Sequence, residues 1–152
     1  MAGYFFDSSA LVKLYHSEPG TSQVLKIFGE RGRRILISRL TLVEIQSAVA
    51  VKVRTGVIGR ETAEALRRRV LGHAASGELA VFTLTDAHFA AAERLIANHG
   101  FEHRLRTLDA LHLAVAGDLR EQGLVDCFVA SDRAICEVAL IEHFSVLNPE
   151  AV

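Results

Sequence analysis

Short apolar runs alternate with longer amphipathic segments along the chain, and this alternation predicts strands separated by helices. The predicted strands are residues 4–6, 35–38, 79–84, 127–130 and 144–147. The predicted helices are residues 8–15, 19–31, 41–54, 61–75, 85–100, 107–123 and 134–141. Because strands separated by helices form a parallel sheet covered on both faces, we predict a three-layer α/β/α fold with a short central parallel sheet.

Polar residues between the strands and the helices predict where the helices begin. Ser8 or Ser9 is expected to cap the first helix. Thr41 is expected to cap the third helix and Thr107 the sixth. Residues 41–44 also match a capping box, in which the Glu44 side chain bonds back to the backbone of Thr41.

Four acidic residues follow the predicted strand ends or helix starts: Asp7, Glu44, Asp109 and Asp132. These points lie on one edge of a parallel α/β sheet, so we expect the four carboxylates to meet there. Each acid also has an ordinary structural interpretation as a helix cap, a turn residue or a helix-dipole partner. Asp126, just before a strand, is the nearest competing ligand.

Four carboxylates in one cleft would repel one another, and without a counter-ion some would be forced to bind protons. A divalent cation removes this conflict, and ligation by oxygen alone favours Mg²⁺ or Mn²⁺ over zinc. Such an ion can acidify a bound water, orient a phosphodiester and stabilise the leaving oxygen. The acids by themselves therefore indicate metal-assisted phosphoryl chemistry.

The composition fits one domain spanning residues 1–152, with half of its residues apolar and no low-complexity linker. The net charge of −1 does not indicate a nucleic-acid-binding protein. The basic residues are nevertheless clustered, and they form either a basic rim or solvated helix faces. The clusters are residues 31–34, 52–54, 67–69 and 104–106.

Two cysteines, Cys127 and Cys136, are too few for a disulfide scaffold, and we expect free thiols in a reducing cytoplasm. The first residues lack the basic start of a signal peptide. No apolar run reaches the roughly 20 residues that a membrane span needs. These features predict a cytoplasmic protein without a membrane segment.

Four segments contain the acids and their neighbours: residues 5–20, 38–44, 106–114 and 129–132. In order and spacing they resemble the four motifs of PIN-domain proteins, especially the VapC toxins of bacterial and archaeal toxin–antitoxin pairs. The third segment is the most specific of the set. The resemblance covers nearly the whole chain.

This resemblance implies a PIN fold, a Mg²⁺- or Mn²⁺-dependent endoribonuclease, a small antitoxin partner and a homodimer. By the same resemblance Asp7, Glu44 and Asp109 hold the principal metal, and Asp132 completes the pocket. Some relatives carry a further acid where this chain has Cys136, which is not a hard oxygen ligand. We therefore expect a weak second metal site.

Five neighbouring residues have two interpretations each. Ser8, Ser131 and Thr107 are either hydrogen-bond donors that support the acids or helix-capping residues. Arg106 either contacts a substrate phosphate or flanks a helix start. His112, on an otherwise apolar helix, is interpreted as a packed, hydrogen-bonded histidine rather than as a catalyst.

Other classes of protein fit less well. A phosphoacceptor receiver domain needs a late lysine near its site, whereas the lysines here are Lys13, Lys26 and Lys52. A haloacid-dehalogenase-like phosphatase needs a second Asp two residues after the first, whereas Asp7 is followed by two serines. A non-catalytic PIN-like module that binds RNA or protein stays open as the alternative. For the antitoxin, we expect a groove between the helices at residues 41–54 and 61–75.

Overall fold

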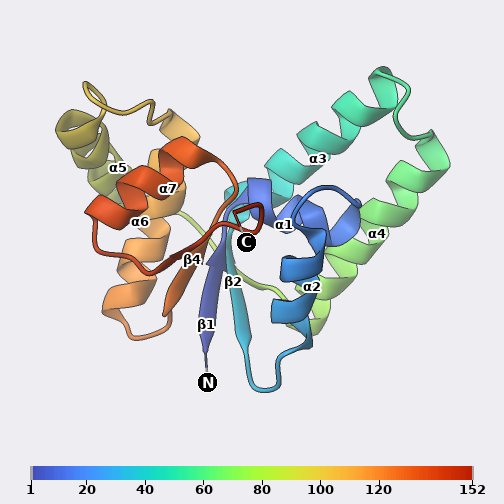
Figure 1. Cartoon of the computed structure of the whole chain (residues 1–152), viewed down its shortest axis with the longest axis horizontal. Helices are drawn as coiled ribbons and strands as arrows, with labels where there is room; N and C mark the ends of the chain where they lie inside the picture. The colour runs from blue at the N-terminus through green and yellow to red at the C-terminus, as the bar shows by residue number, and fades with distance from the viewer. Residues whose placement is uncertain (1, 152) are drawn as a thin grey trace.

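The computed structural model describes residues 2–151, which form a five-stranded parallel sheet with helices on both faces (Figure 1). The sheet has the strand order β3-β2-β1-β4-β5. Its strands are β1 (Gly3–Phe6), β2 (Arg34–Ser38), β3 (Ala80–Phe82), β4 (Cys127–Val129) and β5 (Val146–Leu147). The predicted three-layer α/β/α fold is confirmed.

Each predicted helix is present, with ends that differ by a few residues from the prediction. The helices are α1 (Ser8–Tyr15), α2 (Thr21–Gly29), α3 (Arg39–Arg54), α4 (Arg60–Ser76), α5 (Asp86–His99), α6 (Thr107–Glu121) and α7 (Arg133–Ile141). In Figure 1, α3 and α4 form a hairpin that extends well beyond the sheet. Within residues 2–151, no helix is both long and apolar enough to cross a membrane.

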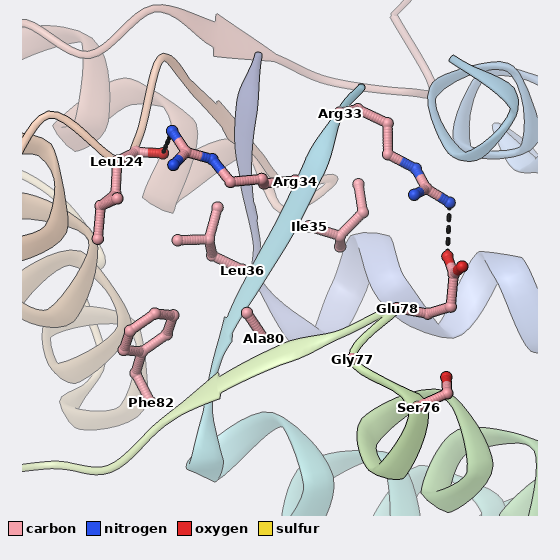
Figure 2. Close-up of a pocket in the computed structure, with 10 residues that line it drawn as sticks. All are labelled: Arg33, Arg34, Ile35, Leu36, Ser76, Gly77, Glu78, Ala80, Phe82 and Leu124. Atoms are coloured by element: carbon pink, nitrogen blue, oxygen red, sulfur yellow. Dashed lines mark hydrogen bonds and ion pairs between the residues drawn. The ribbon is translucent and has the colours of Figure 1, made fainter. Parts of the chain in front are cut away.

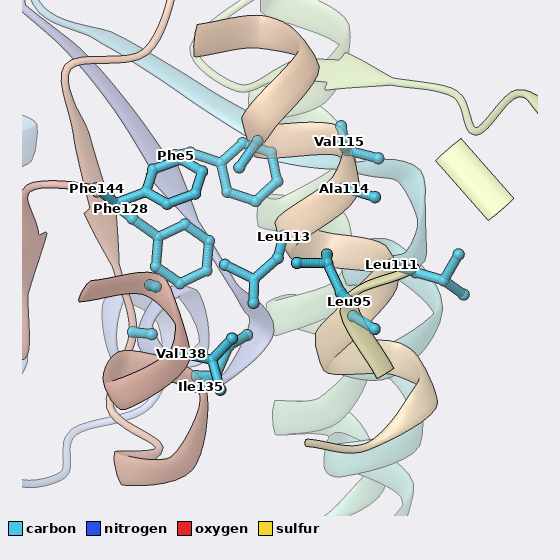
Figure 3. Packing of buried hydrophobic residues seen from close by; sticks show 14 of the residues in the cluster. Phe5, Leu95, Leu111, Leu113, Ala114, Val115, Phe128, Ile135, Val138 and Phe144 are labelled. Carbon is cyan, nitrogen blue, oxygen red and sulfur yellow. The ribbon is translucent and has the colours of Figure 1, made fainter. Parts of the chain in front are cut away.

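Strand β1 is buried on both faces because consecutive side chains of a strand point to opposite sides. Phe5 points into the layer of α5, α6 and α7, and Phe6 points into the layer of α1 to α4. The ring of Phe5 stacks on Phe128 at a centroid distance of 5.7 Å, and Phe128 lies 5.6 Å from Phe144. Figure 3 shows these rings packed beside Leu113 of α6. This packing fixes the central strand, and with it the residue that follows.

The carboxyl ends of three strands meet at the centre of the sheet. Phe6 at the end of β1 pairs with Ile37 of β2 on one side and with Val129 of β4 on the other. The chain leaves β1 toward one side of the sheet and later returns to the other side. Such a switch point opens a crevice beyond the strand ends, where α/β proteins place their sites.

The start of α3 differs from the prediction. Thr41 does not cap this helix, because β2 turns directly into α3 and its last residue, Ser38, takes the capping position. The Ser38 hydroxyl accepts a hydrogen bond from the backbone N–H of Leu40 at 3.1 Å. Thr41 lies buried inside the helix, and Glu44 therefore lies in the second turn rather than the first.

The capping residues of two other helices also precede the predicted ones. Asp7, rather than Ser8 or Ser9, caps α1. Arg106, rather than Thr107, occupies the N-cap position of α6. In α1 the cap follows the last residue of β1, and in α3 the cap is itself the last residue of β2. No connecting loop separates strand and helix in either case, so Ser8 and Ser9 already belong to α1.

Candidate active site

The four acids lie around the carboxyl ends of β1, β2 and β4. Asp7 follows β1 directly, and Asp132 caps α7 just beyond β4. Asp109 lies in the first turn of α6, and Glu44 lies in the second turn of α3. The carboxylate of Asp109 is close enough to raise the pKa of Asp7. Elements from both layers thus bring acidic side chains to the switch point of the sheet.

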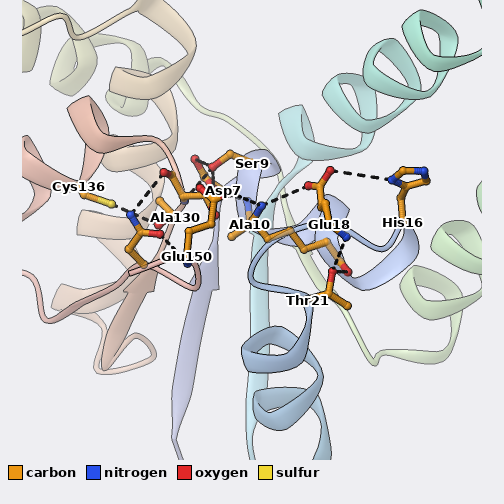
Figure 4. Close-up of polar contacts among 12 residues, drawn as sticks. Asp7, Ser9, Ala10, His16, Glu18, Thr21, Ala130, Cys136 and Glu150 are labelled. Atoms are coloured by element: carbon orange, nitrogen blue, oxygen red, sulfur yellow. Dashed lines mark hydrogen bonds and ion pairs between the residues drawn. The ribbon is translucent and has the colours of Figure 1, made fainter. Parts of the chain in front are cut away.

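Asp7 is almost completely buried, with 3% of its surface exposed. The Ser9 hydroxyl lies 2.7 Å from Oδ1 and 2.8 Å from Oδ2 of Asp7, and the N–H of Ala10 donates to Oδ1 at 3.0 Å (Figure 4). Burial, with a smaller contribution from the charge of Asp109, raises the pKa of Asp7 to about 6 against the lowering effect of these hydrogen bonds. The buried carboxylate therefore favours a nearby positive charge.

Glu44 is held by donors from two other helices. The Ser8 hydroxyl donates to Oε1 at 2.6 Å, and Nε2 of His112 also contacts Oε1. Burial raises the pKa of Glu44, but the hydrogen bonds from His112 and Ser8 outweigh this effect, and the pKa lies below its usual value. The predicted capping box with Thr41 is therefore wrong, because the Glu44 carboxylate points to α1 and α6 instead.

Arg106 connects the other two acids. Its Nε lies 3.2 Å from Oδ2 of Asp109, and its Nη2 lies 3.8 Å from Oδ2 of Asp132. The Arg106 side chain is 68% exposed, whereas that of Asp109 is 8% exposed. The hydrogen bond and the charge of Asp109 raise the pKa of Arg106. The guanidinium thus places a largely exposed positive charge beside Asp109 and Asp132.

The acids share one pattern of hydrogen bonding. In each of them one oxygen is engaged by the protein, while the other has fewer or no partners among residues 2–151. Oε2 of Glu44 and Oδ1 of Asp109 have no hydrogen bond or ion pair in this part of the chain. Oδ1 of Asp132 caps α7 through Ala134 N–H at 2.9 Å, and among residues 2–151 the partner of its Oδ2 is Arg106. The protein thus orients each carboxylate through one oxygen and leaves the other oxygen with fewer partners.

A divalent metal ion fits this donor set. Oxygen ligands suit Mg²⁺ or Mn²⁺. The pKa of Asp7 is raised mainly by burial and to a smaller extent by the charge of Asp109, and a bound cation would offset both effects. Across the described residues, no three His, Cys, Asp or Glu side chains are grouped closely enough to form a ready metal site. Binding of an ion would thus require the carboxylates of Asp7, Glu44, Asp109 and Asp132 to move closer together.

The predicted supporting residues have different positions. Ser8 contacts Glu44, as described above, whereas the Ser131 N–H donates to the Ser9 hydroxyl at 3.0 Å. Thr107 is exposed, and its side chain makes no hydrogen bond within the described residues. Ser9 was predicted only as a possible helix cap and not as a partner of Asp7, although its place two residues after Asp7 was a usable signal.

Two further residues lie outside the acidic set. Cys136 is buried, and its thiol donates to the carbonyl of Ala130 at 3.3 Å. Burial, together with the charges of Asp7 and Asp132, raises the pKa of this thiol to about 12, so it stays protonated. Both cysteines are free, as predicted.

Asp126 accepts from the Gly3 N–H at 2.8 Å, at the amino end of β1, and is thus no competing ligand.

A cavity of about 350 Å³ lies away from the acids, beside β2 and β3 (Figure 2). Its walls combine apolar side chains with two arginines, and Arg33 forms an ion pair with Glu78 at 2.6 Å. None of the four acids lines it. The acidic residues and this cavity are therefore separate features.

Comparisons with known proteins agree with the fold. The family model for the PIN domain matches residues 4–147, and no curated protein matches the chain. VapC20 of Mycobacterium tuberculosis, described as a sarcin-ricin loop cleaving toxin, is 18% identical with a TM-score of 0.68, over 96% of this chain and 99% of that one. PAE2754 from Pyrobaculum aerophilum is 21% identical with a TM-score of 0.67, over 99% and 85%. A toxin–antitoxin complex from Klebsiella pneumoniae contains a chain 16% identical, with a TM-score of 0.62, over 96% and 97%.

Proposed function

Because this chain belongs to the PIN-domain family, we propose that residues 1–152 form a single nuclease domain, a metal-dependent endoribonuclease that is the toxin of a toxin–antitoxin pair. The observation that carries this proposal is the pattern of the acids. Four carboxylates lie at the switch point of the sheet, each with one oxygen held by the protein. Oriented acids of this kind are suited to a divalent cation and a phosphodiester.

Asp7, Glu44 and Asp109 would hold the principal Mg²⁺ or Mn²⁺, and Asp132 would complete the pocket. When bound, such an ion would supply Lewis acidity to the phosphate and would acidify a coordinated water. The hydroxyls of Ser9 and Ser8 hold Asp7 and Glu44 in place. These hydrogen bonds limit the rearrangement that ion binding needs.

Arg106 would bind the phosphate of the substrate. Its side chain is exposed, it lies between Asp109 and Asp132, and its pKa is raised, so it stays charged. A planar guanidinium can donate two hydrogen bonds to one phosphate group. In the proposed hydrolysis, water attacks phosphorus in line with the 3′ oxygen, which leaves with a proton, and the products are a 5′-phosphate and a 3′-hydroxyl.

The nuclease proposal is tested with purified protein freed of any partner, on total RNA, with Mg²⁺, Mn²⁺ or a chelator. We expect cleavage with either ion, none with the chelator, and a loss of at least about a hundredfold in Asp7→Asn and Asp109→Asn. Asp86→Asn is the matched control, because Asp86 is an exposed acid on α5. Binding of RNA without cleavage in all of these conditions would favour the non-catalytic PIN-like module instead.

An antitoxin segment would bind between α3 and α4. A groove of about 330 Å³ lies between these helices, and two apolar side chains on it are exposed, Val43 by 66% and Leu71 by 42%. Arg39 and Arg67 border the groove. An apolar segment flanked by acidic residues would match this surface.

The antitoxin proposal is tested by co-purification with the product of the neighbouring gene. Val43→Asp is expected to abolish the complex and to leave RNA cleavage unchanged. Val57→Asp is the control, because Val57 is 59% exposed but lies in the turn of the hairpin, outside the groove. Equal binding by both variants would place the partner elsewhere.

We also expect a cytoplasmic homodimer, which light scattering separates from a 16.6 kDa monomer.

A further inference from the structure

His112 is a buried polar side chain on an apolar helix. Its exposed fraction is 2%, and its neighbours on α6 are Leu111, Leu113 and Ala114. Burying an imidazole in such surroundings is unfavourable unless the ring forms hydrogen bonds. Nδ1 of His112 has no hydrogen-bond partner among the described residues. The contact of Nε2 with Glu44 is therefore the polar interaction that explains this residue.

The direction of that hydrogen bond follows from chemistry. An ionised carboxylate oxygen can only accept, so Nε2 of His112 donates to Oε1 of Glu44. The same oxygen accepts from the Ser8 hydroxyl at 2.6 Å. Donors from α1 and α6 thus converge on one oxygen of a side chain from α3, while Oε2 has no partner within residues 2–151.

The position of His112 on α6 connects it with a second acid. His112 follows Asp109 by three residues, and residues at this spacing lie on the same face of a helix. One face of α6 therefore presents a carboxylate and, one turn later, the donor that orients another carboxylate. Partners of this kind around metal ligands commonly set ligand orientation and metal affinity.

We propose that His112 is a positioning residue that, together with Ser8, fixes Oε1 of Glu44 and so directs Oε2 toward a divalent cation. This inference rests on the proposed function, because it assumes that the acids bind a metal ion. It assigns His112 no role in contact with RNA. Without the imidazole, Glu44 could rotate, and the affinity of the site for the ion would fall.

The test measures Mn²⁺ affinity rather than cleavage, by titration with electron paramagnetic resonance detection of free Mn²⁺. His112→Gln places an amide N–H₂ close to the position of Nε2, whereas the shorter side chain of His112→Asn reaches only to the position of Nδ1. We expect about a 10- to 100-fold weaker Mn²⁺ affinity in His112→Asn and a change of a few fold at most in His112→Gln. Equal losses in both variants, or no loss in either, would overturn the proposal.

A second measurement needs no variant at His112. In ¹⁵N-labelled wild-type protein, addition of Mg²⁺ is expected to shift the Nε2 resonance of His112 and to leave that of His99, which pairs with Glu142, unchanged. Absence of any shift at His112 while Mg²⁺ binds contradicts the inference. If the two variants differ in Mn²⁺ affinity as predicted but the wild type cleaves no RNA, the role of His112 stands and the nuclease proposal is wrong. If wild-type protein binds no Mn²⁺, both are wrong.

Discussion

Two adjacent serines serve two different carboxylates. Ser8 donates to Glu44, and Ser9 donates to Asp7. Consecutive residues of a helix point about 100° apart, so neighbouring hydroxyls at the start of α1 reach acids on different elements. The Ser9 hydroxyl also accepts from the Ser131 N–H, which ties α1 to the chain segment after β4. The orientation of Asp7 and Glu44 thus depends on two short side chains, those of Ser9 and Ser8.

Burial of the Asp7 carboxylate destabilises the folded protein, and the substitution Asp7→Asn measures this effect. Burial raises its pKa from an ordinary value of 3.8 to about 6. Between these values the folded state binds more protons than the unfolded state, so this residue makes stability fall as pH rises from about 4 to about 6. In the presence of a chelator, Asp7→Asn is expected to be more stable than the wild type at pH 7.5, by about 1–3 kcal/mol.

Urea unfolding between pH 4 and pH 8 measures this effect. The advantage of Asp7→Asn is expected to shrink toward pH 4 and to shrink on addition of Mg²⁺, which would stabilise only the wild type. Asp86→Asn, on an exposed position, serves as the control and should show no such pH dependence. A variant that is less stable than the wild type at every pH would contradict the assigned burial effect.

At the scale of elements, the sequence predicted which strands and helices exist, because their apolar periodicity is a local property. It did not predict the start of α3. Thr41 and Ser38 are both favourable capping residues, and the direct passage from β2 into the helix decides for Ser38.

The acids of the site were predictable for a related reason, and their partners were not. Strand ends in a parallel sheet share one edge, so the placement of Asp7 and Asp132 follows from the order of elements. The contact between Glu44 and His112 joins residues 68 positions apart, and the packing of α3 against α6 decides it. Nothing local to either residue indicates that contact.

The start of β1 depends on the absence of a side chain. A Cβ atom at Gly3 would lie 1.8 Å from the carbonyl oxygen of Leu124. Gly3→Ala is therefore expected to push β1 away from the segment before β4 and to destabilise the protein by about 1–3 kcal/mol. Thermal and urea unfolding measure the loss.

Gly117→Ala is the matched control for this prediction. Gly117 lies within α6, and a Cβ atom there would meet nothing within 4 Å. Because alanine has the higher helix propensity, this substitution should stabilise the protein by about 0.5–1 kcal/mol. A similar effect of both substitutions would show that close backbone approach at Gly3 is unimportant.

At the scale of the whole molecule, a buried lysine joins the two ends of the chain. Nζ of Lys13 on α1 lies 3.3 Å from Glu18 and 3.2 Å from Glu150, and the Lys13 side chain is 5% exposed. In the same C-terminal segment as Glu150, the side-chain amide of Asn148 donates to the carbonyl of Ser131 at 3.5 Å. The segment after β5 thus crosses the carboxyl edge of the sheet.

Replacement of the lysine should release this segment. Since the two glutamates are 24% and 40% exposed and stay hydrated, Lys13→Met is expected to change global stability by only about 1 kcal/mol. Amide exchange at residues 148–151 should become faster. Lys26→Met, at an exposed position of α2, is the control. Unchanged exchange in Lys13→Met would mean that other contacts hold the segment.

The central position of β1 determines when the acids can meet during synthesis of the protein. β1 is made first, yet its neighbour β4 pairs with it through residues 127–129, near the other end of the chain. Contacts so distant in sequence form late in folding, and residues 7–129 must leave the ribosome before Val129 can reach Phe6. A nascent chain interrupted before β4 contains Asp7, Glu44 and Asp109 but not Asp132, and β1 has no partner strand on one side. The acidic cluster is therefore a property of finished molecules, and translation itself delays its assembly.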